Sequence, residues 1–275
     1  MRAGTPGARE GAPRMTGMTK SRIGELLDDW YARVSKPEFI ASDPVAFPRR
    51  FSYPCDIEIA AFLAAAIAWG RRDLVLRSAG RMFALMGKSP CDYVMSGGWK
   101  KLSNRVVHRT FFEGDLKYYC RGLRLCYETY GSLEALFADH DGAGEGVWRG
   151  MSLFRDTAAK ANGGAFSRHI ADPGAHSACK RLNLALRWLV RKDAVDMGLW
   201  KAVPPSSLYI PLDVHAARTA RLLGLLERKT DDKKAVLELT SRLREFSPED
   251  PVKYDFALFG MGIHGRDPVS NQPGC

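Results

Sequence analysis

Apolar residues recur at every third or fourth position along most of this 275-residue chain. That spacing predicts an amphipathic helix over 21–34 and another over 115–129. Residues 57–69 are apolar on nearly every side, which indicates a helix at the centre of a core, and 71–87 resume the helical period with a basic face. Further helices are expected at 133–140, 146–160, 176–191, 214–225, 231–246 and 251–261.

Capping residues support several of these helix starts. Ser21, Asp56 and Ser132 each precede an apolar-periodic run, and Ser247 or Asp250 precedes the last helix. Alternation with a period of two is not sustained in any segment, and 88–113 have a mixed pattern. We therefore predict an all-α fold.

Two segments interrupt the helical pattern. Residues 1–20 are rich in Gly, Pro, Arg and Ala and lack the continuous apolar core of a secretory signal. We expect them to form a disordered leader, and Met1, Met15 and Met18 are all candidates for the true start. The remainder, 21–275, is predicted to be one all-α region in two lobes, with the lobe boundary near the Gly-rich stretch 141–149.

The composition indicates an anionic partner and no membrane span. Lys and Arg number 41 against 31 Asp and Glu, which gives a net charge of +10 and a pI of about 9.4. Such a charge favours polyanions, nucleic acid before an anionic membrane, although a basic soluble enzyme with no anionic partner is the alternative. The most apolar stretch, 57–69, carries Glu58 and is shorter than the ~20 residues that a membrane span needs.

The six cysteines are scattered and include no CxxC pair or His/Cys cluster. We therefore expect no zinc or other metal site and no cofactor. The pattern favours reduced thiols in a cytoplasmic protein, with Cys55, Cys120 and Cys126 as ordinary buried residues.

Lys180 and Asp213 are the candidate catalytic residues. Lys180 lies where a loop meets an apolar-periodic helix, and Asp213 stands at a helix start shortly after a proline. An amine that attacks carbon, beside a carboxylate that stabilises developing positive charge, is the minimum set for cleaving a glycosidic bond through an imine. The alternatives are a solvated lysine on a basic helix and a plain N-cap aspartate, and capping and catalysis can coexist at Asp213.

Other side chains are candidates for binding substrate or nucleic acid. Basic residues recur on several predicted helices, and a surface shared by such helices could follow a phosphate backbone, although solvated polar faces are the simpler account of each. Aromatic residues could stack an extruded base, with core packing as the alternative for Trp69 and Trp188. The candidates for binding are Arg71, Arg72, Arg181, His215, Arg218 and Tyr209.

Glu58, Asp250 and Asp255 are further candidates for the polar groups of a site. Glu58 could contact substrate or be a first-turn charge favoured by the helix dipole. Asp250 is favoured as a cap, and a general acid–base pair with Asp255 is the weaker interpretation.

The order of the segments over roughly 56–262 resembles the helix-hairpin-helix DNA glycosylase superfamily, which has the endonuclease III-like fold. The likeness is carried by four segments in sequence order: DIEIAAFLAAAIAWGRRDLVLRSAGRMFALMG, DLKYYCRGLRLCYETYGSLEALF, DPGAHSACKRLNLALRWLV and IPLDVHAARTARLLGL. The third occupies the place of the hairpin, and the fourth that of the helix led by the catalytic aspartate. The whole chain also looks like a bacterial family of conserved proteins of unknown function.

The chain departs from the superfamily at three points. Its hairpin loop normally reads Leu-Pro-Gly-x-Gly, but only Pro173 and Gly174 match here. The interval between Lys180 and Asp213 is wider than in most members, as it is in the archaeal 8-oxoguanine glycosylase branch. The four-cysteine iron–sulfur cluster of some members is absent, because only Cys275 lies near the C-terminus.

The resemblance implies a two-lobed helix-hairpin-helix glycosylase-like fold and a DNA base-excision glycosylase. It implies abasic-site lyase activity through a Schiff base on Lys180, with damaged double-stranded DNA as the substrate. One alternative is a non-catalytic nucleic-acid-binding protein of the same fold. The other is a soluble helical protein with no role in nucleic-acid chemistry, whose charge serves solubility.

Overall fold

The computed structural model describes residues 18–138 and 146–264. These residues are mostly helical, which confirms the all-α class. The α-helices are α1 (Lys20–Val34), α2 (Pro37–Ala41), α3 (Pro54–Ala66), α4 (Arg72–Met86), α5 (Pro90–Ser96), α6 (Glu113–Tyr130), α7 (Leu133–Phe137), α8 (Gly146–Lys160), α9 (Lys180–Val190), α10 (Val214–Leu222), α11 (Lys233–Arg244) and α12 (Tyr254–His264). Short 3-10 helices are η1 (Pro44–Ala46), η2 (Pro48–Arg50), η3 (Gly98–Lys101), η4 (Pro205–Ser207) and η5 (Pro251–Lys253).

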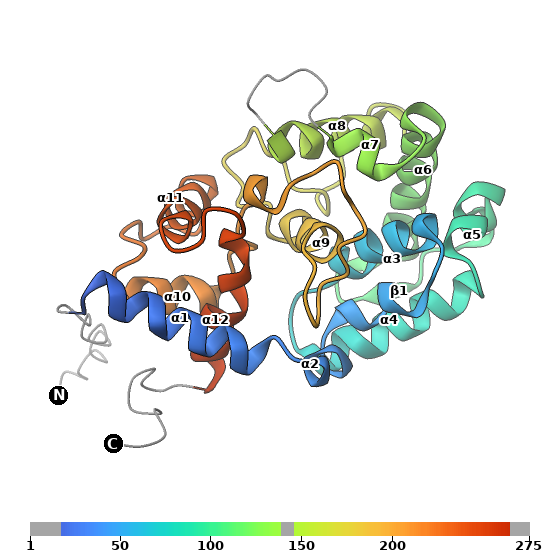
Figure 1. The fold of residues 1–275 in the computed structure, drawn as a ribbon. Coiled ribbons are helices and arrows are strands. Elements are labelled where there is room, and N and C mark those ends of the chain that lie inside the picture. Colours follow the sequence, from blue (N-terminus) through green and yellow to red (C-terminus); the bar gives the residue numbers. More distant parts are fainter. Residues whose placement is uncertain (1–17, 139–145, 265–275) are drawn as a thin grey trace, which may run out of the picture.

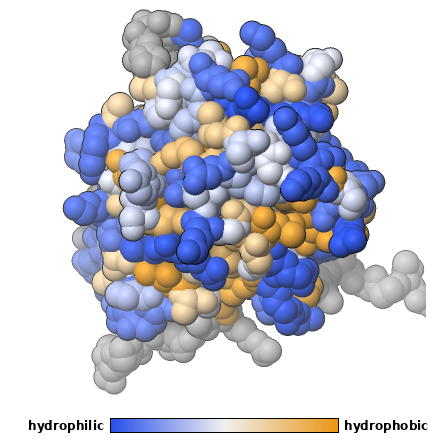
Figure 2. Space-filling model, turned by 90° about the vertical axis from the view of Figure 1, so that its right-hand side faces the viewer, coloured by the Kyte–Doolittle hydropathy of each residue, from blue (hydrophilic) through white to orange (hydrophobic). Residues whose placement is uncertain are grey.

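The helices gather around α3 and α9, which pack against each other (Figure 1). On one side, α1 and α10 both pack against α12, the last helix of the chain. On the other side, α6 packs against α5, α7 and α8. Figure 2 views the side that carries α4, α5 and α6, where hydrophilic side chains break up the apolar surface.

Helix α3 is central because its sequence has no polar face. Its residues from Glu58 to Ala66 are buried, in agreement with the prediction that this segment lies within a core. The core that it joins is contiguous from Leu26 in α1 to Met261 in α12. The predicted lobe boundary partly lies outside the described residues, since 139–145 are not described, and α8 directly after them packs on α6 and α7.

Within this core, Glu58 is a structural residue. Its carboxylate accepts hydrogen bonds from the Tyr127 hydroxyl, from Trp200 Nε1 at 2.6 Å, and from the backbone amides of Leu133 and Glu134 at 3.1 Å. Burial raises the pKa of Glu58, while these donors favour its charged form. The side chain therefore joins α3 to the start of α7 and is not available to a substrate.

A small β-hairpin within 88–113 differs from the sequence prediction. Strands β1 (Val106–His108) and β2 (Phe111–Phe112) pair antiparallel before α6 begins. Strands of three and two residues are too short to produce a period-two signal, so the sequence pattern could not reveal them.

Of the caps predicted at Ser21, Asp56 and Ser132, the first two are wrong and the third is confirmed. Thr19, not Ser21, caps α1 by accepting from the amide of Arg22. Helix α3 begins at Pro54, and Asp56 in its first turn instead accepts from Ser89 Oγ and from the Cys91 amide, both at 2.8 Å. Ser132 caps α7 as predicted, through a 3.0 Å bond from the amide of Ala135.

The expectation of six reduced cysteines is also corrected. Cys55 forms a disulfide with Cys91, with the two Cα atoms 5.7 Å apart. The bond joins the first turns of α3 and α5, which the contact between Asp56 and Cys91 holds together, and no local spacing announces this pairing. Cys120 and Cys126 are buried free thiols, as predicted.

The first 17 residues of the predicted leader lie outside the described residues, and α1 begins at Lys20, the last residue assigned to it. Among the described residues, no helix is long and apolar enough to cross a membrane.

Candidate functional site

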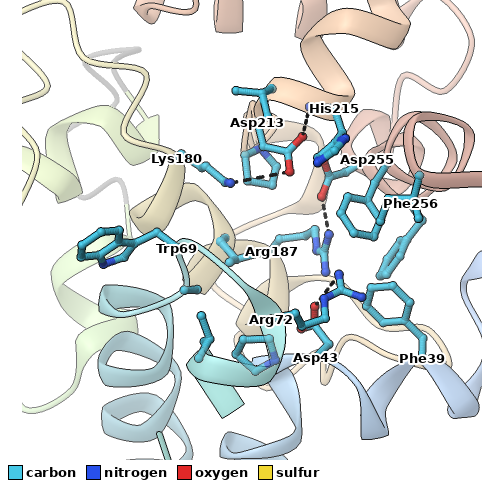
Figure 3. Close-up of a pocket in the computed structure, with 18 of the residues that line it drawn as sticks. Phe39, Asp43, Trp69, Arg72, Lys180, Arg187, Asp213, His215, Asp255 and Phe256 are labelled. Carbon is cyan, nitrogen blue, oxygen red and sulfur yellow. Dashed lines mark hydrogen bonds and ion pairs between the residues drawn. The ribbon is translucent and has the colours of Figure 1, made fainter. Parts of the chain in front are cut away.

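Lys180 and Asp213 lie side by side at the starts of two helices (Figure 3). Lys180 is the first residue of α9, after a sharp backbone turn in which Cys179 has φ +47°. Asp213 is the N-cap of α10. Lys180 Nζ is 3.6 Å from Asp213 Oδ2, and the two side chains are 39% and 15% exposed. A substrate can therefore reach the amine, whereas the carboxylate is largely enclosed.

The two oxygens of Asp213 have separate roles. Oδ1 accepts from the amides of His215 at 2.9 Å and Ala216 at 2.8 Å, which confirms the predicted cap. Oδ2 faces the lysine. Because the cap fixes the carboxylate on a rigid helix end, its second oxygen has a defined position in the site.

A cavity of about 550 Å³ opens beside this pair. Its walls include the aromatic side chains of Phe39, Trp69, Phe256 and Phe259. Val214 and Ile263 also line it and are 69% and 47% exposed, so they form an apolar rim. In Figure 3, Trp69 lies across the cavity from Phe39 and Phe256. Flat apolar walls with charged groups between them suit an aromatic ligand that also carries polar atoms.

Two further ion pairs line the cavity. Arg187 binds Asp255, and Arg72 Nη2 lies 3.6 Å from Asp43 Oδ2. The Arg72 guanidinium also lies over the rings of Phe39 and Phe259, at 5.3 and 4.8 Å from their centroids. Together with the Lys180–Asp213 pair, these ion pairs place three positive and three negative side chains at the cavity. Their charges cancel, so the cavity has fixed charges of both signs without a large net charge.

Burial changes the acidity of these carboxyl groups. It raises the pKa of Asp255 to about 6, against the opposing effect of Arg187 and with the help of nearby Asp213. Burial likewise raises the pKa of Asp43, although Arg187, Arg72 and Lys180 oppose it. Burial also raises the pKa of Cys179, which precedes the lysine, to about 11, so this thiol is not a competing nucleophile.

A buried network of ion pairs continues from Arg187, which lines the cavity. Arg187 Nε lies 3.3 Å from Asp196, which also binds Arg191. Arg191 in turn holds Asp250 through Nε at 2.7 Å and Asp193 through Nη1 at 2.9 Å. Asp250 stands at the N-cap position of η5, but its side chain binds Arg191 and makes no capping hydrogen bond.

The structure brings only some of the candidate residues to the cavity. His215, Arg72 and Trp69 line it together with the Lys180–Asp213 pair. Arg71 is paired with Asp73, and Arg218 donates to the Gly262 carbonyl at 2.9 Å, both outside the cavity lining.

Three other candidates point elsewhere. Arg181 donates to the Ala66 carbonyl at 2.7 Å and so joins α9 to the end of α3. Tyr209 packs on Trp148, with ring centroids 5.2 Å apart, and Trp188 is fully buried.

Asp43 and Arg187 line the cavity but the sequence did not identify them as site residues, whereas Asp255 lines it as one of the weaker candidates. Asp43 lies in a Pro/Phe/Arg-rich connector, and Arg187 is one of several basic residues on its predicted helix. The only local signal was an arginine at a buried position of α9, where its helical period places it beside Leu186 and Val190.

The loop before α9 differs from a phosphate-binding hairpin. Its amides at Gly174 and Cys179 bond to the side chains of Asp172 and Ser177, at 2.8 and 3.2 Å. No helix directly precedes the loop, since α8 ends at Lys160. The amides of Gly174 and Cys179 are therefore not free to bind a phosphate.

Among the residues of 18–138 and 146–264, no group of three or more His, Cys, Asp or Glu side chains could hold a metal ion. Comparison with known proteins finds one family, described as "Protein of unknown function (DUF2400)", whose model matches residues 43–264. No curated protein and no solved structure matches the chain.

Proposed function

The chain belongs to the DUF2400 family of proteins of unknown function, and we propose that it is a DNA base-excision glycosylase with abasic-site lyase activity. The observation that carries the proposal is the 3.6 Å contact between Lys180 Nζ and Asp213 Oδ2 at the edge of the cavity. The Lys180 amine, at the start of α9, can act as a nucleophile. The enclosed Asp213 carboxylate, at the start of α10, can stabilise positive charge.

The cavity supports a nucleobase as ligand. Its volume of about 550 Å³ lies within the roughly 300–1,000 Å³ typical of small-molecule sites. Trp69, Phe39 and Phe259 offer aromatic surfaces on which a base extruded from the duplex can stack. The charged pairs Arg187–Asp255 and Arg72–Asp43 offer hydrogen-bond donors and acceptors for its edge.

In the first step, Lys180 replaces the base at C1′ of the sugar. The neutral amine attacks C1′ while the C1′–N bond breaks, and the bond's electron pair leaves with the base, which takes up a proton. Asp213 Oδ2 is placed to receive the proton that Nζ must lose and to stabilise the positive charge that develops at C1′.

In the second step, the bond between C1′ and the ring oxygen opens to give an imine on Nζ, and the ring oxygen is protonated. The imine acidifies C2′, so loss of a C2′ proton is followed by cleavage of the C3′–O bond and departure of the 3′ phosphate. Water then hydrolyses the imine and restores the lysine. This sequence needs no oxidant or reductant.

A screen of duplex oligonucleotides, each with one damaged or mismatched base, tests the proposal. The wild-type protein should release a free base from at least one of them, and Asp213→Asn should lower the rate at least ~100-fold, as expected for loss of an electrostatic group. Asp73→Asn is the matched control, because it removes the same charge from an exposed carboxylate paired with Arg71 and Arg77. Release by Asp213→Asn at the wild-type rate would reject the proposed role.

A non-catalytic nucleic-acid-binding protein is the second candidate. The observation in its favour is the net charge of +10, which favours a polyanionic partner whether or not the protein cleaves a bond. This protein would bind DNA with strong salt dependence and release no base from any oligonucleotide in the screen.

A further inference from the structure

The tip of the β1–β2 hairpin holds a residue in an unfavourable backbone conformation. Arg109 has φ +51°, at the first position of the two-residue turn between His108 and Phe111. Glycine or asparagine usually occupies such positions, since a side chain costs roughly 1–2 kcal/mol in the left-handed region. The conformation therefore needs support from its surroundings.

The residues on both sides of Arg109 are fixed by hydrogen bonds. Buried His108 contacts Ser78 Oγ through Nδ1 at 3.1 Å and the Trp69 carbonyl through Nε2 at 2.8 Å. The carbonyl of Thr110 accepts from Arg168 Nη2 at 3.0 Å and contacts His169 Nε2 at 3.1 Å. The strained turn is thus held from both sides, a pattern found where a side chain must be presented in one position.

That side chain packs against a residue of the cavity wall. The Arg109 guanidinium lies 4.8 Å from the centroid of the Trp69 ring, and Trp69 lines the cavity. It also uses the space left by Gly70, where a Cβ would lie only 2.5 Å from Arg109 Nη1. Both Gly70 and Trp69 thus accommodate this one guanidinium beside the site.

The charge of Arg109 is not neutralised by an acid. Arg71, the N-cap of the neighbouring helix α4, and Arg72 and Arg77 within that helix all form ion pairs with aspartates. Arg109 is exposed and has no ion-pair partner among the residues that the structure describes. Among the described residues, its guanidinium makes a cation–π contact with the face of the Trp69 indole. This contact leaves the N–H groups at the edge of the guanidinium available.

We infer that Arg109, held at the hairpin tip against Trp69, binds a backbone phosphate of the nucleic-acid strand whose base enters the cavity. A planar guanidinium presents paired N–H donors that match two phosphate oxygens, and its stacking on Trp69 fixes the direction of those donors. The inference rests on the nucleic-acid partner of the proposed function but not on its chemistry. It gives the hairpin a role that the loop before α9, with its bonded amides, does not fill.

Substitution of Arg109 separates this role from a structural one. Arg109→Gly removes the guanidinium and relieves the strain at φ +51°, so its thermal stability should equal or exceed that of the wild type. Arg109→Lys keeps the charge but loses the planar donor pair. Arg77→Ala is the control, since it removes one exposed arginine that is already paired with Asp73.

The measurement is fluorescence anisotropy of a labelled duplex with a non-cleavable abasic analogue, titrated at several KCl concentrations. Arg109→Gly should bind roughly 10-fold more weakly, and its log–log salt slope should be shallower by about 1, the value for one lost phosphate contact. Arg109→Lys should restore the slope, and Arg77→Ala should keep both wild-type values. The inference is rejected if Arg109→Gly binds like the wild type, or if Arg109→Lys fails to restore the slope.

Base release is measured separately, with the same protein preparations, on the duplexes that carry one damaged or mismatched base. If the slope difference persists while no variant releases a base, the phosphate contact stands and the proposed chemistry fails. If bases are released but Arg109→Gly leaves the slope unchanged, the chemistry stands and this inference fails.

Discussion

Asp213 uses one oxygen to cap α10 and turns the other toward Lys180, 3.6 Å away. Capping needs only an oxygen acceptor, whereas the contact with the lysine depends on negative charge. The structural and the proposed catalytic roles of this side chain can therefore be separated by substitution.

Asp213→Asn should keep most of the stability, because asparagine is as good an N-cap as aspartate, while Asp213→Ala should lower the free energy of unfolding by about 1 kcal/mol. Base release should be lost in both variants. Urea denaturation compares their stabilities. Equal destabilisation by the two substitutions would show that the charge, and not the cap, stabilises this helix end.

The acidity of Asp255 predicts a pH dependence of stability. Its pKa is about 6 in the folded protein, above the value of an exposed carboxyl near 4, so the folded state holds this proton more tightly than the unfolded state. This residue's contribution to stability is therefore greatest below pH 4, falls as pH rises to about 6 and is constant above that.

The asparagine side chain of Asp255→Asn cannot titrate, so this variant lacks the pH-dependent contribution to stability. Relative to the wild type, it should gain up to about 3 kcal/mol between pH 4 and pH 7, from the free energy of about 1.4 kcal/mol per unit of pKa. Denaturation curves at half-unit intervals of pH provide the test. A difference between the two proteins that stays constant over this range would contradict a raised pKa.

Arg191 should be among the most sensitive positions outside the cavity. It is 1% exposed and binds Asp193, Asp196 and Asp250, so Arg191→Ala leaves buried carboxylates without their partner. We expect a loss of about 3–5 kcal/mol in the free energy of unfolding. Arg77→Ala, which breaks only an exposed pair, should cost less than about 1 kcal/mol under the same conditions.

The Cys55–Cys91 disulfide predicts a dependence of stability on reducing agent. It closes a loop with a sequence separation of 36, for which the loss of chain entropy corresponds to roughly 4 kcal/mol. Dithiothreitol should lower the stability of the oxidised protein by up to that amount. Cys55→Ser should be equally stable with and without the reductant, and a shift in that variant would assign the effect to another thiol.

Local pattern predicted most helices of the fold because their apolar faces repeat along the chain. The buried helix α3 and the Ser132 cap are examples, as each depends on residues a few positions apart. The Cys55–Cys91 bond and the β1–β2 hairpin were missed for the opposite reason. The first joins residues far apart in sequence, and the second contains strands of only three and two residues.

The candidate site shows the same division. Asp213 was identified because an N-cap aspartate after a proline is a local signal, and Lys180 because it stands at a helix start. The pairing of Arg187 with Asp255 spans 68 positions, and Arg109 acquires its place only through the contact of the hairpin with Trp69. Such relationships depend on tertiary packing, which periodicity does not encode.

Borohydride trapping on duplex DNA with an abasic site tests the central claim most directly, because it reduces an imine to a stable bond between lysine and sugar. The wild-type protein should form a covalent adduct whose peptide map places the DNA on Lys180, and Lys180→Gln should form none. Lys192→Gln is the control, since it removes an exposed lysine outside the cavity. Absence of an adduct from the wild type, or an adduct that persists in Lys180→Gln, would contradict the proposed mechanism.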